Sequence, residues 1–310
     1  MVARRARWWA AALVMAALTG CGSTADTFSS PGAKGAPEVT DEKDLPSLPL
    51  DRYRLGDDES RRWTRAQQRL AQRCMVDLGF TDFPADPKPP SAPTASGTLT
   101  ITAAPTPLGR LDLDKAERWG YGWDPKVSRR RPPEPAGRVM TDREFAALYG
   151  RGGGRDTPSG RIPPEQGCSG QANRRLLKGV EDVTRMWTYV SGRDAALHKA
   201  VMKDRKVRRA FATWSKCVTD KGGERYPDPL AAYGAKAWDR GKDGNTTHTR
   251  RELETAVADV ECKREHNTLG VWWAVATERQ RADIQRNKAT YEAVRDDLGV
   301  LRGNIREALG

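Results

Sequence analysis

Histidine is scarce in this sequence, with three residues in 310, and no two of its five cysteines form a Cys-x-x-Cys pair. Structural zinc sites take their ligands from closely spaced cysteines and histidines. Only His266 lies near a cysteine in the sequence, at Cys262. The sequence therefore predicts no metal centre.

Catalytic motifs are missing as well. The Gly-x-Ser-x-Gly turn of the α/β hydrolases does not occur, and the glycine-rich run at 150–155 lacks the Gly-Lys-Ser/Thr ending of a phosphate-binding loop. The histidines His198, His248 and His266 stand in polar surroundings, so we expect them at the surface. No catalytic residue and no cofactor is assigned.

Long apolar runs are also absent. The longest, Trp8–Leu18, has 11 residues, whereas a membrane-spanning helix needs about 20. It follows the basic residues Arg4, Arg5 and Arg7, and it ends in Leu18-Thr19-Gly20-Cys21. This order is that of a signal peptide, and its last four residues resemble the lipobox of bacterial lipoproteins.

We therefore predict that residues 1–20 are a lipoprotein signal peptide. Cys21 is then the lipid attachment site, and the protein is held on the extracytoplasmic face of the cell membrane. The alternative is an ordinary secretory signal in which Cys21 occurs by chance. The residues after Arg4-Arg5 do not follow the twin-arginine pattern, which favours general secretion.

The charge is strongly basic, with 53 Lys and Arg against 41 Asp and Glu. Removal of the leader leaves 50 basic residues and a net charge of +9. An exported basic protein meets phospholipid headgroups and anionic wall polymers, so we expect no nucleic acid partner. Much of the charge is of mixed sign along expected helices, which is typical of a solvated surface.

Four cysteines remain once Cys21 is set aside, in a compartment where disulfides persist. They allow three pairings. We favour Cys74–Cys168 with Cys217–Cys262, because each bond then ties one cysteine-bearing element to the next in sequence.

The remaining pattern predicts an all-α fold with little or no strand. Residues 21–56 are rich in Gly, Ser, Thr and Pro and are predicted to form a flexible linker, or stalk. Residues 57–310 are predicted to form one disulfide-stapled helical bundle, with a long proline-rich loop inside an irregular insertion at about 84–140. The aromatic segment 119–123 in that insertion is expected to pin a loop to the core, although it also suits stacking on sugar rings.

Several helices are bounded by local signals. Capping boxes at Thr141–Glu144 and Thr249–Glu252 begin two of them, and the second helix is expected to be long and apolar on two faces, through Val275. A break is expected at 191–192. A heptad-like helix at about 280–302 is expected to pack within the chain rather than against a partner.

Two of the expected cysteine helices end alike. Cys74 and Cys217 are each followed by Asp, Gly, an aromatic residue and Pro at offsets of three, five, nine and ten. A helix stopped by glycine and followed by a turn that folds back over its end produces this pattern. The repeat predicts two related helical hairpins, each closed by one disulfide.

The segments Trp214-Ser-Lys-Cys217, Tyr226-Pro227 and Ala258-Asp-Val-Glu-Cys262-Lys263, with Gly167-Cys168 upstream, resemble a set of actinobacterial secreted lipoproteins of unassigned function. The resemblance covers roughly residues 60–300. It implies an envelope location and paired cysteines, and it brings no catalytic residues.

These observations favour a lipid-anchored envelope protein with a non-enzymatic binding role. Its expected partners are the membrane, through Cys21, and an anionic wall polymer or another envelope protein. The alternative is a wall-active, glycan-cleaving enzyme with an unidentified acidic catalytic residue. A buried glutamate in a cleft beside residues 119–123 favours the enzyme.

Overall fold

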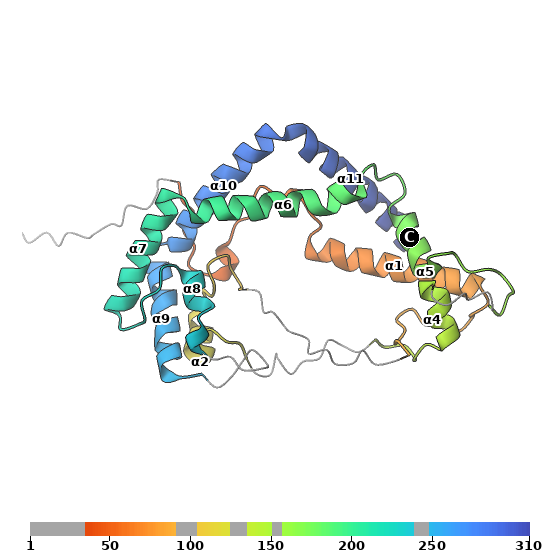
Figure 1. Ribbon diagram of the computed structural model, residues 1–310, viewed down its shortest axis with the longest axis horizontal. Coiled ribbons are helices and arrows are strands. Elements are labelled where there is room, and N and C mark those ends of the chain that lie inside the picture. The colour runs from red at the N-terminus through yellow and green to blue at the C-terminus, as the bar shows by residue number, and fades with distance from the viewer. Residues whose placement is uncertain (1–34, 91–103, 125–134, 151–156, 239–247) are drawn as a thin grey trace, which may run out of the picture. The chain divides into compact units, whose positions relative to one another are not determined.

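The computed structural model describes residues 35–90, 104–124, 135–150, 157–238 and 248–310, and within them the chain is all-α, as predicted. Figure 1 shows the helices in chain order. Their bounds are α1 Asp57–Asp77, α2 Leu113–Trp119, α4 Asp142–Tyr149, α5 Gly167–Leu176, α6 Val183–Met202, α7 Arg205–Asp220, α8 Pro229–Tyr233, α9 Arg250–Glu265, α10 Thr268–Arg286 and α11 Lys288–Leu309. Among these residues, none of the helices has the length and apolar character that crossing a membrane requires.

The described residues bury three apolar clusters. The first joins α1, α4, α5, α6 and α11. The second lies between α7 and α10, where Val207 and Phe211 meet Leu269, Trp272 and Trp273. The third joins α2, α7, α8 and α9 around the fully buried Trp214. Each disulfide staples one of these clusters, since Cys168 belongs to the first and both Cys217 and Cys262 belong to the third.

The capping signals read from the sequence do begin helices. At α4, the Thr141 hydroxyl accepts from the Glu144 backbone N–H, and the Glu144 carboxylate accepts from the Thr141 N–H at 2.7 Å. At α9, Thr249 caps Glu252 in the same way, but the Glu252 carboxylate accepts from the backbone N–H of Tyr121 at 3.0 Å. The second capping box is therefore only half formed.

The expected break at 191–192 is wrong, because α6 continues through it from Val183 to Met202. Ser191 and Gly192 lie on the exposed side of this helix, while Val190 and Leu197 are buried. Figure 1 shows α6 running beneath the corner that α10 and α11 make, and α6 contacts both. This packing outweighs the weak helix preference of one serine and one glycine.

The heptad-like helix predicted at 280–302 is two helices, which meet at Asn287. The corner forms around the fully buried carboxylate of Asp283, which accepts from Arg193 of α6 (Nε, 3.0 Å), from the Tyr291 hydroxyl of α11 (2.7 Å) and from Asn287 (3.2 Å). The seam itself packs within the chain, as expected. Its residues Tyr291, Val294, Leu298 and Leu301 are all buried in the first cluster.

The long helix expected from Thr249 through Val275 is likewise interrupted, at Asn267, whose φ of 44° is left-handed. Its side chain clamps the incoming chain. Nδ2 donates to the Pro37 carbonyl at 2.9 Å, and Oδ1 accepts from the Val39 N–H at 3.2 Å. The break between α9 and α10 is therefore the place where the N-terminal segment joins the folded body.

This clamp corrects the prediction of a flexible linker for its part from residue 35 to residue 56, whereas residues 21–34 lie outside the described part of the chain. Residues 35–56 pack onto the body: Val39 and Leu50 are fully buried, and the Leu50 N–H donates to Gln280 at 3.1 Å. The short 3-10 turns η1 (Glu42–Asp44) and η2 (Asp51–Tyr53) occur in this segment. A few large apolar residues are enough to hold a segment that is otherwise polar.

The insertion at 84–140 is only partly irregular. Residues 91–103 and 125–134 lie outside the described part of the chain, but α2 stands between them and packs on α9. Residues 108–111 run into the core, where Leu108 and Leu111 are fully buried. The insertion therefore supplies part of the second and third clusters.

The internal repeat has a common geometry. Gly79 and Gly222 both have left-handed φ values, of 95° and 84°. In both copies a residue two positions before the cysteine donates to the carbonyl of the aromatic residue nine positions after it. Gln72 Nε2 donates to Phe83 at 3.0 Å, and Ser215 Oγ donates to Tyr226 at 2.7 Å. The turn thus folds back over the helix end in both hairpins, as the sequence predicted.

Candidate functional site

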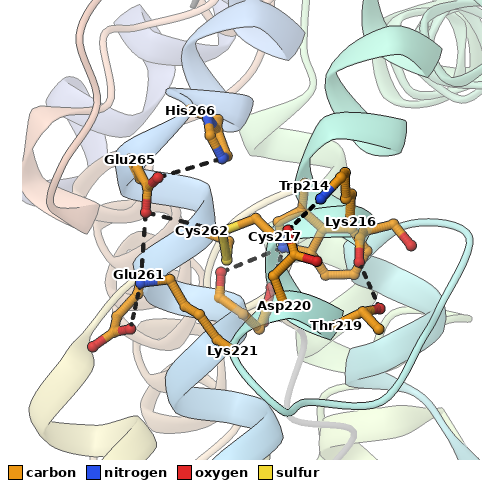
Figure 2. The surroundings of a disulfide bond; sticks show 12 residues. Trp214, Lys216, Cys217, Thr219, Asp220, Lys221, Glu261, Cys262, Glu265 and His266 are labelled. Carbon is orange, nitrogen blue, oxygen red and sulfur yellow. Dashed lines mark hydrogen bonds and ion pairs between the residues drawn. A yellow bond between two sulfur atoms is a disulfide. The ribbon is translucent and has the colours of Figure 1, made fainter. Parts of the chain in front are cut away.

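The cysteines pair as Cys74–Cys168 and Cys217–Cys262, with Cα atoms 5.6 and 5.8 Å apart. This is the pairing that the sequence favoured. The first bond joins α1 to α5 and the second joins α7 to α9. Figure 2 shows the second bond with a charged cluster beside it, in which Lys221 lies 3.1 Å from Glu261 and 3.5 Å from Glu265.

Helix α9, which carries Cys262, also holds a buried ion pair that the sequence did not reveal. Lys263 Nζ is 3.0 Å from Asp259 Oδ2, one turn apart on α9, and both side chains are almost fully buried. Lys263 also donates to the carbonyls of Leu108 and Arg110 in the insertion. The Asp259 carboxylate accepts from Trp214 Nε1 at 2.9 Å.

Burial sets the titration of this pair. It raises the pKa of Asp259 and lowers the pKa of Lys263, because each charge has left water, and the attraction between the two charges opposes both shifts. Burial, together with the nearby Asp259 carboxylate, also raises the pKa of the Tyr121 hydroxyl well above its usual value. The network ties α7, α9 and the insertion together, so its role is structural.

A buried glutamate does lie beside the aromatic segment 119–123. Glu252 is 2% exposed, accepts from the Tyr121 backbone N–H, and lies 3.4 Å from Nδ1 of His248. Tyr121 itself is fully buried and stacks on Trp238 with ring centroids 5.5 Å apart. Neither groove described below is lined by Glu252 or Tyr121. The aromatic segment pins the insertion to the core, which was the expected role.

The histidines are less exposed than predicted, since His198, His248 and His266 are all partly buried. His198 packs against Trp272 with ring centroids 5.7 Å apart. His266 comes close to Cys217 and Glu265, with candidate ligand atoms within 4.8 Å of one another. The Cys217 sulfur is bonded to Cys262, however, so this cluster offers no thiolate to a metal ion.

One groove, of about 410 Å³, is bordered by η2, α1 and α6. Trp63 of α1 and Trp187 of α6 meet edge to face with ring centroids 5.7 Å apart. Trp187 is 43% exposed, which is unusual for so large an apolar side chain. Ser60 and Ser191 also line the groove. We call it the tryptophan groove.

A second groove, of about 640 Å³, lies between α7 and the turn at 225–228. Met202 and Phe211 supply apolar lining, Tyr226 lines it as well, and the side chains of Arg208 and Arg225 are exposed beside them. We call it the basic groove. Neither arginine has an ion pair among the described residues, and Asp228, which also lines the groove, caps α8 by accepting from the Ala231 N–H at 2.9 Å.

Cys21, the predicted lipid attachment site, lies outside the described residues, as do the signal peptide and the linker up to residue 34. The four other predicted site residues are all placed, in two disulfides. The tryptophan groove was missed in the sequence because it combines residues that are far apart along the chain, from Tyr53 to Leu298. The basic groove lies within residues 202–228, and it was missed because its basic residues were interpreted as a solvated helix surface.

Comparison of the chain with models of protein families, with curated proteins and with solved structures found no match.

Proposed function

We propose that this protein is a lipid-anchored lipoprotein of the cell envelope that binds another envelope protein and has no catalytic role of its own. The observation that carries the location is the pair of disulfides, each closed inside an apolar cluster. Disulfides persist in extracytoplasmic compartments and are rare in the cytosol. The lipobox-like segment Leu18-Thr19-Gly20-Cys21 supports the same location, outside the cytoplasm.

The tryptophan groove supports the binding role. Tryptophan is enriched among the residues that dominate protein–protein binding energy, usually in pockets at the centre of an interface. Here two tryptophans border a groove on helices whose positions are fixed by the first cluster. The groove is mainly apolar, with small hydroxyl groups from Ser60, Thr64 and Ser191, and so suits an apolar side chain of a partner protein.

The glycan-cleaving alternative needs an acid that reaches its substrate. Glu252 is the candidate for this acid, because it is buried next to Tyr121 of the aromatic segment. Its carboxylate is instead buried against a backbone N–H and His248. Its position supports a structural role, which favours binding over catalysis.

Photo-crosslinking in intact cells tests the binding role. A photoreactive amino acid at Ser191, inside the tryptophan groove, is expected to capture a discrete envelope protein. The matched control is Thr188, which is exposed on the same helix and does not line the groove. Adding Trp187→Ala to the Ser191 variant should abolish the capture.

Equal capture from Ser191 and Thr188, or capture that survives Trp187→Ala, contradicts the groove as the binding site. Capture of glycan fragments instead of protein supports a wall ligand and overturns the proposal.

A further inference from the structure

Basic residues concentrate around the N-terminal half of α7. Helix α7 has five basic residues and one acidic residue, whereas α1, the equivalent helix of the repeat, has five basic and four acidic residues. Residues 199–209, which include the start of α7, contain six basic residues and one acidic residue. The acid, Asp204, is already engaged: it lies 2.5 Å from Arg279 and accepts from the Lys206 N–H at 2.9 Å. Its charge therefore does not neutralise the neighbouring side chains.

Most basic side chains of this surface have no carboxylate partner among the described residues; the exception is Lys206, which lies 4.0 Å from Glu278. Lys203, Arg205, Arg208, Arg209 and Arg225 are exposed, and none forms an ion pair within the described part of the chain. Three of them share one face of α7, since 205, 208 and 209 are three and four residues apart. The opposite face, with Val207 and Phe211, is buried. We call these five residues the α7 basic face.

The helix that carries this face packs beside the place where the segment 35–56 joins the folded body. Val39 is buried in the same cluster as Val207 and Phe211 of α7, and Asn267 clamps Pro37 and Val39. Only 15 residues separate Cys21 from Pro37, and a fully extended chain between them spans at most roughly 55 Å. A lipid on Cys21 therefore holds this part of the body near the bilayer.

The basic groove adds an apolar component. Arg208 and Arg225 line it together with Met202, Phe211 and Tyr226. A ligand that suits this lining carries a negative charge next to an apolar portion. An anionic phospholipid has this chemistry, because its phosphodiester is attached to apolar acyl chains. A soluble polyanion can contact only the arginines of the groove and not its apolar side chains.

We infer that the α7 basic face docks on anionic phospholipid headgroups, with the basic groove receiving one of them. This rests on the proposed anchoring at Cys21, which brings the face to the membrane. Basic clusters attract anionic membrane surfaces, and each Lys or Arg near the surface strengthens partitioning about fivefold. The docking orients the body and leaves the tether to supply the permanent attachment.

Vesicle binding by unacylated protein tests the inference independently of the lipid. The mature chain is exported behind an ordinary secretion signal, so that no lipid is added, and is mixed with vesicles containing phosphatidylglycerol or with pure phosphatidylcholine. We expect cosedimentation with the first kind only, weakened by added salt. The variant Arg205→Gln/Arg208→Gln/Arg209→Gln should bind on the order of 100-fold more weakly.

The repeat offers a matched control. Arg62, Arg65 and Arg73 of α1 are also exposed and without an ion pair among the described residues, and changing all three to Gln removes the same charge. This control should keep nearly all of the binding. Circular dichroism and a thiol count establish that both variants are folded with their disulfides intact.

Equal loss in the two triple variants overturns the inference, because binding then follows net charge rather than the α7 basic face. Two further results also overturn it: binding to phosphatidylcholine alone, and complete displacement by soluble poly(glycerol phosphate) at an equal phosphate concentration. Failure of acylation at Cys21 in cells leaves the vesicle result intact, so the two proposals fail separately.

Discussion

The buried pair Asp259–Lys263 allows a sharp test of how the third cluster is held together. Changing Lys263 to Met keeps an unbranched side chain about as long as the aliphatic part of lysine but removes the ammonium. The Asp259 carboxylate then stays buried with no cation, and the carbonyls of Leu108 and Arg110 lose their donor. Removal of one partner from a buried pair typically costs about 3–5 kcal/mol.

That cost is a large share of the roughly 5–15 kcal/mol by which a domain is stable. Urea unfolding followed by tryptophan fluorescence measures it well, because Trp214 donates to Asp259. A surface reference comes from Arg279→Met, which breaks a pair whose side chains are 38% and 20% exposed and should cost less than about 1 kcal/mol.

A double-mutant cycle separates the pair from its surroundings. Asp259→Asn alone leaves a buried ammonium and should also cost about 3–5 kcal/mol. The double variant leaves no buried charge from this pair, so we expect it to be more stable than the sum of the two changes predicts, by at least about 2 kcal/mol. Additive effects, or a Lys263→Met cost no larger than that of Arg279→Met, refute this reasoning.

Three other expectations follow from the contacts. Hydrogen bonds from Arg138 lower the pKa of Glu144 from 4.5 to about 2, so the stability that its carboxylate contributes is present above pH 4.5 and is lost as the pH falls through 2. Glu144→Gln should therefore cost up to about 3 kcal/mol at pH 7 and only about 0.4 kcal/mol near pH 2, as measured by urea unfolding across pH. Replacing both cysteines of the Cys74–Cys168 bond, which closes 94 residues, by alanine should lower the free energy of unfolding by about 4.7 kcal/mol. The same change at Cys217–Cys262, which closes 45 residues, should lower it by about 4.0 kcal/mol. Variants that are as stable in urea as the parent protein contradict this expectation. A methyl group at Gly270 overlaps the Pro37 carbonyl, so Gly270→Ala should loosen the segment 35–56 from the body and speed its cleavage by trypsin after Lys43. The control Gly192→Ala, whose added methyl group meets nothing within 4 Å, should leave the cleavage rate unchanged.

Local signals in the sequence were enough for the helices and their starts. Thr141 and Glu144 need only each other to begin α4, and the apolar spacing of α1 and α7 reflects one buried face. The helix starts depend on residues that are near one another along the chain. The disulfide pairing followed from chain order instead, because each bond joins two cysteines that are consecutive in the sequence although they lie 94 and 45 residues apart.

The breaks and the buried charges depend on distant residues. The corner at Asn287 needs Arg193 to meet Asp283, and the clamp at Asn267 needs the segment around Val39. Asp259 and Lys263, four residues apart, look like an ordinary surface pair in the sequence. They are buried because Trp214 of α7 and the insertion pack over them.

The proposed function requires that the protein is acylated at Cys21 outside the cytoplasm and that its four other cysteines are paired. Intact-mass analysis of the native protein, extracted from membranes and alkylated without reduction, tests this claim directly. We expect a chain that begins at Cys21, carries the added mass of diacylglycerol and takes up no alkylating reagent. An intact leader, or four alkylated cysteines, contradicts it.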